Sequence, residues 1–148
     1  MFRNLLQPPD RGVIEALHFL RRIYESIHTE SQRNTERGHW ISEAFVVRLW
    51  AVLEAHRIVG ARTIVKSLDG ADEVRVCRML RNQIAHSKAE ITGAKARHLD
   101  RTVRRVFKLG DQKSLFEGKF VLSKDTVLRP MHEACLRYSH ALLDKHAA

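Results

Sequence analysis

The stretch that decides the expected fold is Asp69-Gly-Ala-Asp-Glu-Val-Arg-Val-Cys-Arg-Met-Leu-Arg-Asn-Gln-Ile-Ala-His-Ser-Lys-Ala-Glu-Ile91. At about 100° per residue, its apolar side chains gather on one side of a helix. This core-facing stripe consists of Val76, Cys77, Leu80 and Ile84. Asp69 is expected to cap the helix, and the acids of its first turn, Asp72 and Glu73, complement the helix dipole. The stretch is therefore predicted to be an amphipathic helix that packs on a core.

The opposite side of this helix carries positive charge and hydrogen-bond donors. Four polar residues fall within an arc of roughly 80°, and Arg81 lies beside that arc. The four are Arg75, Arg78, Asn82 and His86. Guanidinium groups together with an imidazole that titrates near neutrality favour contact with a phosphodiester. The alternative is structural, because an Arg and a His at a helix end can simply hydrogen-bond its last carbonyls.

The segment Arg81-Asn82-x-x-Ala85-His86, with Leu80 before it, resembles the Arg-x4-6-His signature of HEPN domains. HEPN domains are small all-α domains, and many are metal-independent endoribonucleases of prokaryotic toxin and defence systems. The resemblance implies an all-α, HEPN-like helical bundle of about five helices that forms a single domain over residues 1–148. It also implies a small β-hairpin at 116–122 before a long last helix, as in one subgroup of the family.

The resemblance further implies a catalytic pair, Arg81 and His86, with Asn82 in support. RNA cleavage without a metal needs a base for the 2′-hydroxyl, an acid for the 5′-oxygen and positive charge on the phosphorane. One helix supplies one histidine, and HEPN domains complete the site as a two-fold homodimer whose motif helices face each other. A cyclic phosphate product and no metal or other cofactor are expected. In some family toxins an antitoxin modifies a tyrosine two residues after the histidine, and Lys88 departs from that pattern.

Two functions follow from this resemblance. The first is an endoribonuclease that acts as the toxin or effector of a prokaryotic stress or antiphage system, with a cognate antitoxin or another protein as its partner. The second is a non-catalytic HEPN module that binds RNA or a protein and serves as a dimerisation unit. Both predict a homodimer with a basic surface, so the sequence does not choose between them.

The composition favours a polyanionic partner and argues against a membrane. The chain has 148 residues and a net charge of +9, with 26 Lys and Arg against 17 Asp and Glu. A high-GC genome favours arginine codons and can account for the excess of arginine over lysine, but it does not account for the positive net charge. Such a charge points to nucleic acid, an acidic protein or an anionic membrane as partner, and nucleic acid is the leading choice. No run approaches the about 20 apolar residues of a membrane span, and the two cysteines are expected to be buried free thiols in a cytoplasmic protein.

The segment from Ala94 to Leu109 is predicted to be the most basic helix. Its apolar stripe is surrounded by cations, and only Asp100 interrupts them. Together with Arg75 and Arg78, four of these cations are predicted to contact the RNA backbone: Arg101, Arg104, Arg105 and Lys108. The alternative is an ordinary solvated helix face, which is what most basic runs are.

Three further helices complete the predicted bundle. The first runs from Pro8-Pro9-Asp10 to about Thr29, and a loop over 30–39 follows it. The second runs over 40–59, with Ser42 as its N-cap and Gly60 as its stop. Pro130 requires the last helix to begin near it or to bend there. The inner stripe of that helix is Met131, Cys135, Tyr138 and Leu142, and Tyr24, Tyr138, Trp40 and Trp50 are expected in the core. The nine histidines include no pair at i, i+4, so no metal site is predicted.

Overall fold

The computed structural model describes residues 7–27, 35–60, 63–86, 93–110 and 122–147. Within these ranges all regular secondary structure is helical, which confirms the predicted all-α class. The elements are α2 (Val13–Ile27), α3 (Glu36–Ala55), α4 (Ala71–His86), α5 (Gly93–Phe107), the π-helical turn η2 (Lys124–Leu128) and α6 (Arg129–Ala147). The predicted hairpin at 116–122 lies outside the described residues except for its last residue, Leu122, which is buried.

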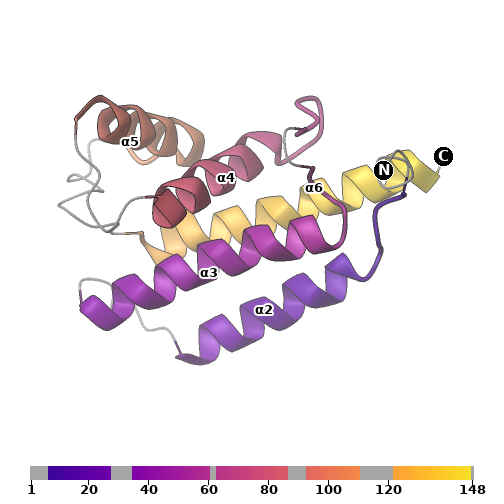
Figure 1. Cartoon of the computed structure of the whole chain (residues 1–148), viewed down its shortest axis with the longest axis horizontal. Coiled ribbons are helices and arrows are strands. Elements are labelled where there is room, and N and C mark those ends of the chain that lie inside the picture. The colour runs from indigo at the N-terminus through magenta and orange to yellow at the C-terminus, as the bar shows by residue number, and fades with distance from the viewer. Residues whose placement is uncertain (1–6, 28–34, 61–62, 87–92, 111–121, 148) are drawn as a thin grey trace.

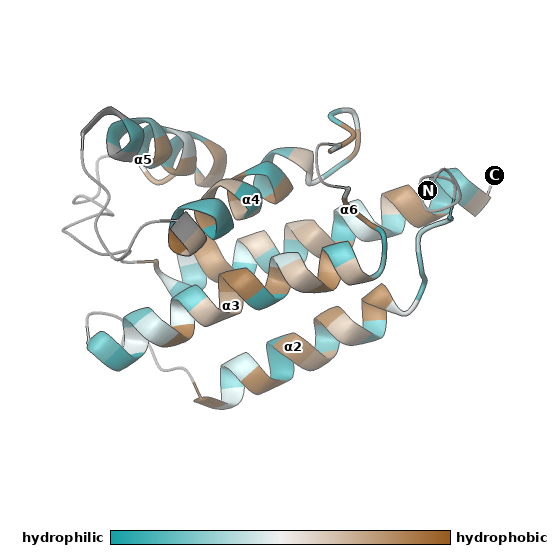
Figure 2. Ribbon diagram, in the orientation of Figure 1, coloured by the Kyte–Doolittle hydropathy of each residue, from teal (hydrophilic) through white to brown (hydrophobic). Residues whose placement is uncertain are grey.

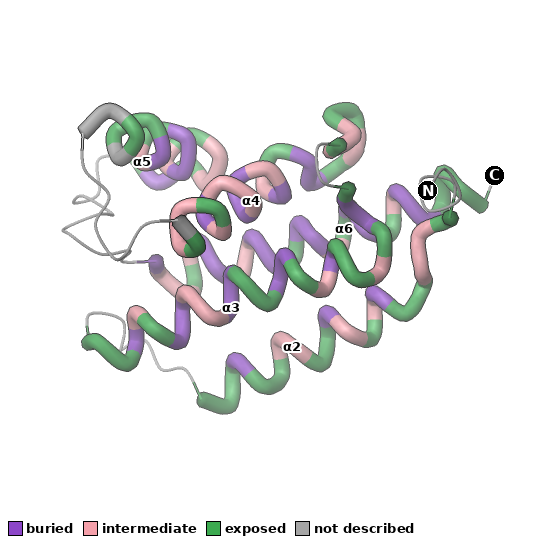
Figure 3. The backbone as a smooth tube through the Cα atoms, in the orientation of Figure 1, coloured by how far each residue is buried: buried purple, intermediate pink, exposed green. Residues whose placement is uncertain are grey.

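The helices form a bundle in which α3 and α6 occupy the middle (Figure 1). Helix α2 packs against both of them, α4 packs against α3 and α6, and α5 packs against α4. The brown segments in Figure 2 and the buried segments in Figure 3 follow the inner sides of these helices. The predicted inner stripe of α6 is confirmed, since Met131, Cys135, Tyr138 and Leu142 are all buried.

Helix α3 begins four residues earlier than predicted. Thr35 is its N-cap, and the Thr35 hydroxyl accepts a hydrogen bond from the Gly38 N–H at 3.0 Å. Ser42, which was predicted to be the cap, lies in the second turn and is buried. A polar segment without apolar residues was therefore wrongly assigned entirely to a loop, because a cap and the first helical turn need no core contact.

The same helix ends before Gly60, the predicted stop. Arg57 adopts a left-handed φ of 59°, and its Nε donates to the Pro8 carbonyl at 2.8 Å. The N–H groups of Ile58 and Val59 both reach back to the Leu53 carbonyl, so these residues are buried in a turn and not in a helix. The apolar side chains of this turn had extended the predicted helix by four residues.

Helix α4 begins at Ala71, and Asp69 does not cap it as predicted. The Asp69 carboxylate instead accepts from Arg137 Nε of α6 at 3.3 Å. Gly70 supplies the sharp entry with a φ of +84°, and a Cβ at this position would lie 2.3 Å from the Ala134 carbonyl oxygen. The entry to α4 is thus defined by a backbone contact with α6, which a local capping pattern does not reveal.

The predicted helix start near Pro130 is confirmed. The π-helical turn η2 precedes it, and the Arg129 N–H still bonds to the Lys124 carbonyl. Pro130 has no N–H to donate, so it is tolerated in the first turn of α6. No helix among the described residues is both long and apolar enough to cross a membrane.

Candidate functional site

The predicted core stripe of α4 is largely confirmed. Val76, Cys77 and Leu80 have no exposed surface, and Ile84 is half-buried against the core. Val74 is also fully buried, although it lies outside the predicted stripe. The side of α4 away from these residues is therefore the only part of the helix that can meet a ligand.

The cationic face of α4 consists of Arg75, Arg78, Arg81 and Asn82. The three arginines are half-buried and Asn82 is exposed. The face therefore lies at the surface, and the aliphatic parts of the arginine side chains are partly covered. Arg81 Nη1 donates to the Asn82 Oδ1 at 3.0 Å, which holds the two predicted site residues together. This contact fixes one edge of the Arg81 guanidinium and leaves its other donors for a ligand.

These arginines are only weakly neutralised by acids. Arg75 lies 3.9 Å from Asp72, whose side chain is 71% exposed, so this ion pair adds little. Within the described ranges Arg78 and Arg81 form no ion pair with a carboxylate. An arginine-rich face with so little acidic neutralisation is suited to a phosphate, since a guanidinium group can bind two phosphate oxygens at once.

His86 is the last residue of α4. Its side chain lies outside what the structure describes, and so do Ser87 and Lys88. The backbone therefore places His86 one turn beyond Asn82 on the helix, which is the position that the motif requires. Its hydrogen-bond partners stay a prediction.

The predicted RNA-contacting residues of α5 divide into two groups. Arg101 and Arg105 are exposed, and so is Lys108. Lys108 was predicted to lie within the helix, but α5 ends at Phe107 and Lys108 adopts a left-handed φ of 55°. Arg104 instead donates to Asp100 Oδ2 and to the Gly110 carbonyl, each at 3.0 Å. Arg104 thus holds the end of α5 in place, and its side chain is less exposed to a polyanion than sequence spacing alone indicated.

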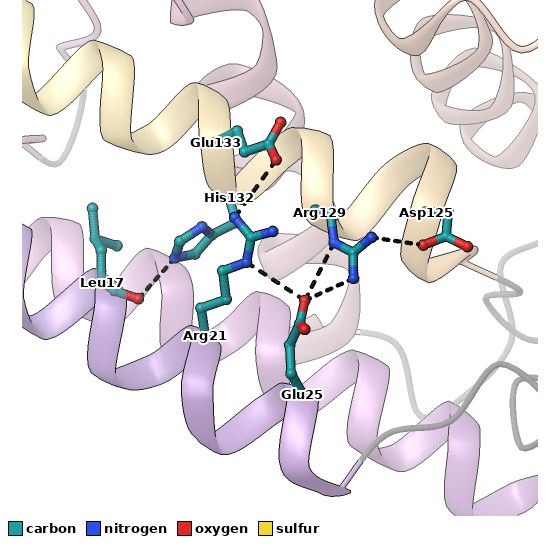
Figure 4. A network of polar contacts seen from close by, with 7 residues as sticks. All are labelled: Leu17, Arg21, Glu25, Asp125, Arg129, His132 and Glu133. Carbon is teal, nitrogen blue, oxygen red and sulfur yellow. Dashed lines mark hydrogen bonds and ion pairs between the residues drawn. The ribbon is translucent and has the colours of Figure 1, made fainter.

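A polar cluster that the sequence analysis missed joins α2 to α6 (Figure 4). Glu25 accepts from Arg129 at 2.9 Å and lies 3.5 Å from Arg21, and Arg129 also contacts Asp125 at 3.0 Å. The hydrogen bond from Arg129 lowers the pKa of the Glu25 carboxyl. His132 lies beside this cluster, fully buried, and its Nε2 contacts the Leu17 carbonyl at 2.7 Å.

This cluster holds α2 and α6 together. Its charged side chains pair with one another, and one nitrogen of the buried imidazole, Nε2, contacts a backbone carbonyl on α2. One feature of the sequence could have indicated that His132 is buried. On the helical wheel it lies about 80° to 100° from the α6 stripe, on the same side as Ser139 and Leu143. Burial there depends on α2 covering that side, which the α6 sequence alone does not state.

Cys77 and Cys135 are buried free thiols, as predicted. The Cys77 thiol contacts the Val46 carbonyl at 3.9 Å. A hydrogen bond with Cys77, together with burial, raises the pKa of Cys135. The two thiols are therefore inert packing groups. No cluster of three or more His, Cys, Asp or Glu side chains suited to a metal ion occurs in the described part of the chain.

The comparisons with known proteins give no relative. No protein-family model, no curated protein and no solved structure matches this chain. Any function must therefore be argued from the residues and their placement.

Proposed function

We propose that this protein is a metal-independent endoribonuclease of the HEPN type, acting as a homodimer whose two α4 helices share one site. The observation that carries the proposal is the cationic face of α4, where Arg81 is held by Asn82 and no acid pairs with Arg78 or Arg81 in the described ranges. His86 follows at the helix end. The neighbouring helix α5 presents Arg101 and Arg105 for further backbone contacts, and Lys108 follows directly after it.

The chemistry follows from the groups that two copies bring together. His86 of one protomer takes the proton from an RNA 2′-hydroxyl, whose oxygen attacks the adjacent phosphorus. The bond from phosphorus to the 5′-oxygen breaks, and the partner's His86 gives a proton to that oxygen. The Arg81 guanidinium groups hold the non-bridging oxygens while negative charge builds on the phosphorane. The products are a 2′,3′-cyclic phosphate and a 5′-hydroxyl.

The test is cleavage of a labelled RNA in the presence of EDTA. The wild type is expected to cleave, and His86→Ala is expected to lose about 10²-fold or more, since that is the usual contribution of a general acid or base. His140→Ala is the matched control, because His140 is exposed on α6 and outside the proposed site. Equal rates for the wild type and His86→Ala, or RNA binding without any cleavage, would overturn the proposal. Binding without cleavage would favour a non-catalytic RNA-binding module.

The cellular role that we propose is that of a toxin or stress effector directed at RNA. Growth arrest on expression is expected, and Arg81→Ala or His86→Ala is expected to relieve it. The proposal includes no membrane partner.

A further inference from the structure

Exposed apolar side chains gather where α2 and α3 lie side by side (Figure 1). Trp40 of α3 is 69% exposed, and Ile23 and Ile27 of α2 are each 45% exposed. The exposure of Trp40 contradicts the prediction that it lies in the core. A contiguous exposed apolar patch on a small domain marks a contact with another molecule.

A pocket of about 100 Å³ opens between these two helices. Its floor consists of Tyr24 and Phe45, which are buried and whose ring centroids are 4.2 Å apart. Apolar side chains of both helices surround that floor. These residues are here named the α2–α3 groove: Leu20, Ile23, Ile27, Trp40 and Ala44. The groove therefore offers apolar surface from two helices to one ligand.

The size of the pocket indicates what it can hold. Small-molecule sites have volumes of about 300 Å³ or more, and an apolar cavity of about 150 Å³ accepts a benzene ring. A pocket of about 100 Å³ therefore has room for one aliphatic side chain but not for a nucleotide or a cofactor. Such a side chain fills the pocket as the anchor of a larger polypeptide.

The α3 side of the groove carries positive charge. Arg48 is the only charged residue among the described residues that line the pocket, and it is exposed. Arg37 is also exposed and lies about 20° from Arg48 on the helical wheel. Neither arginine forms an ion pair with a carboxylate in the part of the chain that the structure describes. The acids of α3 lie about 100° or more away from both arginines, beyond Trp40: Glu36, Glu43 and Glu54. The groove is thus apolar and bordered by cations.

We propose that the α2–α3 groove binds an acidic amphipathic helix of a partner protein. One apolar side chain of that helix fills the pocket beside Trp40, and carboxylates on its flanks pair with Arg37 and Arg48. The two arginines are eleven residues apart in the sequence. That separation is about 16 Å along α3, so carboxylates about three turns apart on the docked helix can meet both. Carboxylates are favoured there because a guanidinium group can bind both of their oxygens at once.

A helix fits this groove better than an extended segment. The backbone groups of α2 and α3 are used within their own helices, so they offer no partners to the N–H and C=O groups of an extended chain. A docked helix satisfies its own backbone and packs its side chains between those of its two neighbours. The inference uses no residue of α4 or α5, so it does not depend on the ribonuclease proposal.

The lining and the shape of the groove disfavour two other ligands. Its apolar side chains offer RNA bases no replacement for the hydrogen bonds that the bases make with water. A membrane surface favours a raised apolar face, whereas this pocket is concave and fits one side chain. A polypeptide with an apolar anchor and flanking acids matches both the pocket and its border.

Two designed peptides of about 18 residues test the charge of the ligand. Both carry leucines at alternating three- and four-residue spacing, and their flanking positions are glutamate in one and lysine in the other. Fluorescence anisotropy of the labelled peptides is expected to show that the wild type binds the glutamate peptide about tenfold or more tightly than the lysine peptide. The double variant Arg37→Glu with Arg48→Glu is expected to reverse this preference. Arg11→Glu with Lys66→Glu is the matched control, because it makes the same change in net charge at exposed residues outside the groove.

Trp40 reports where the peptide lies. Trp50, the other tryptophan, is only 3% exposed, so quenching of the protein fluorescence by acrylamide comes mainly from Trp40. The glutamate peptide is expected to protect Trp40 from the quencher. Trp40→Ala is expected to weaken peptide binding about tenfold or more, because the pocket loses one wall. Phe19→Ala is the control, since Phe19 is 57% exposed on α2 but does not line the pocket.

Several results would overturn the inference. Equal binding of the two peptides would show that charge does not select the ligand, and a glutamate peptide that binds more weakly than about 1 mM would show that the groove takes no such helix. Binding that leaves Trp40 open to acrylamide would place the peptide elsewhere. Protection of Trp40 by self-association, by RNA or by vesicles of anionic phospholipid, without protection by the glutamate peptide, would assign the groove to that other ligand.

Discussion

The imidazole of His132 ties protonation to the stability of the fold. It is fully buried, its Nε2 contacts the Leu17 carbonyl at 2.7 Å, and its ring lies 6.2 Å from that of Phe45. Because a carbonyl only accepts, Nε2–H must be the donor. Nδ1 is buried and has no hydrogen-bond partner among the described residues, so the neutral ring is the form that fits.

Burial lowers the pKa of His132 from its ordinary value of 6.5. As the pH falls below about 6.5, the unfolded chain therefore binds this proton before the folded one does, and the free energy of unfolding decreases. We expect the melting temperature to fall between pH 7 and pH 5, and to fall less in His132→Gln, which keeps a donor for Leu17 but does not titrate. The exposed His140→Gln serves as control, and an equal pH dependence in His132→Gln would contradict this assignment.

Single residues also show where prediction from the sequence stops. The stripe of α6 was readable from Met131, Cys135 and Tyr138, because their spacing alone places them on one side. His132 and Trp40 were not readable. His132 lies at the edge of its stripe and is buried because α2 covers it. Trp40 was predicted to lie in the core, and this prediction is wrong, because its side chain is 69% exposed on the outer side of α3.

At the level of helices, the entry to α4 depends on a close approach to α6. Gly70→Ala would place a Cβ 2.3 Å from the Ala134 carbonyl oxygen at a φ of +84°. We expect a loss of unfolding free energy of more than about 2 kcal/mol, from the clash and the strained backbone together. Gly110→Ala is the control, because Gly110 has a φ of +62° but nothing within 4 Å of its added Cβ.

Gly110→Ala should cost only about 1 kcal/mol, which is the usual penalty of the left-handed conformation for a residue with a side chain. Both values follow from urea denaturation at fixed pH. Equal losses in the two variants would mean that the contact between Gly70 and α6 does not determine how α4 enters the bundle.

Different arginines of α5 are expected to affect RNA binding and the stability of the fold. Arg101→Ala and Arg105→Ala are each expected to reduce the salt dependence of RNA binding by about 0.7 per lost phosphate contact, with little change in melting temperature. Arg104→Ala removes the hydrogen bonds to Asp100 and Gly110 and is expected to cost about 1 kcal/mol of stability. Salt titrations of RNA affinity, paired with thermal melts, distinguish the two behaviours. A salt slope that falls only in Arg104→Ala would contradict this division.

The helices themselves were predictable and their ends were not. Apolar periodicity placed every described α-helix, since burial on one face is a local property of the sequence. The start of α3 at Thr35, the left-handed Arg57 and the entry at Gly70 depend on capping or on contacts with distant residues. For the site, the sequence predicted the cationic face of α4. It did not show that the Arg104 side chain hydrogen-bonds to groups at the end of its own helix.

At the level of the whole molecule, the cationic face and the exposed apolar residues lie on neighbouring helices. The cationic face belongs to α4, and the exposed Trp40 and Val47 belong to α3, against which α4 packs. A single protomer offers one His86 for two proton transfers, so the proposed activity requires a second copy of the chain.

The central claim is that two copies of this chain complete one ribonuclease site. The most direct test is the initial rate of RNA cleavage per protomer in EDTA, measured over a dilution series alongside sedimentation of the same samples. We predict that the rate per protomer falls as the dimer dissociates. A rate per protomer that stays constant into the monomeric range, or no cleavage at any concentration, would contradict the claim.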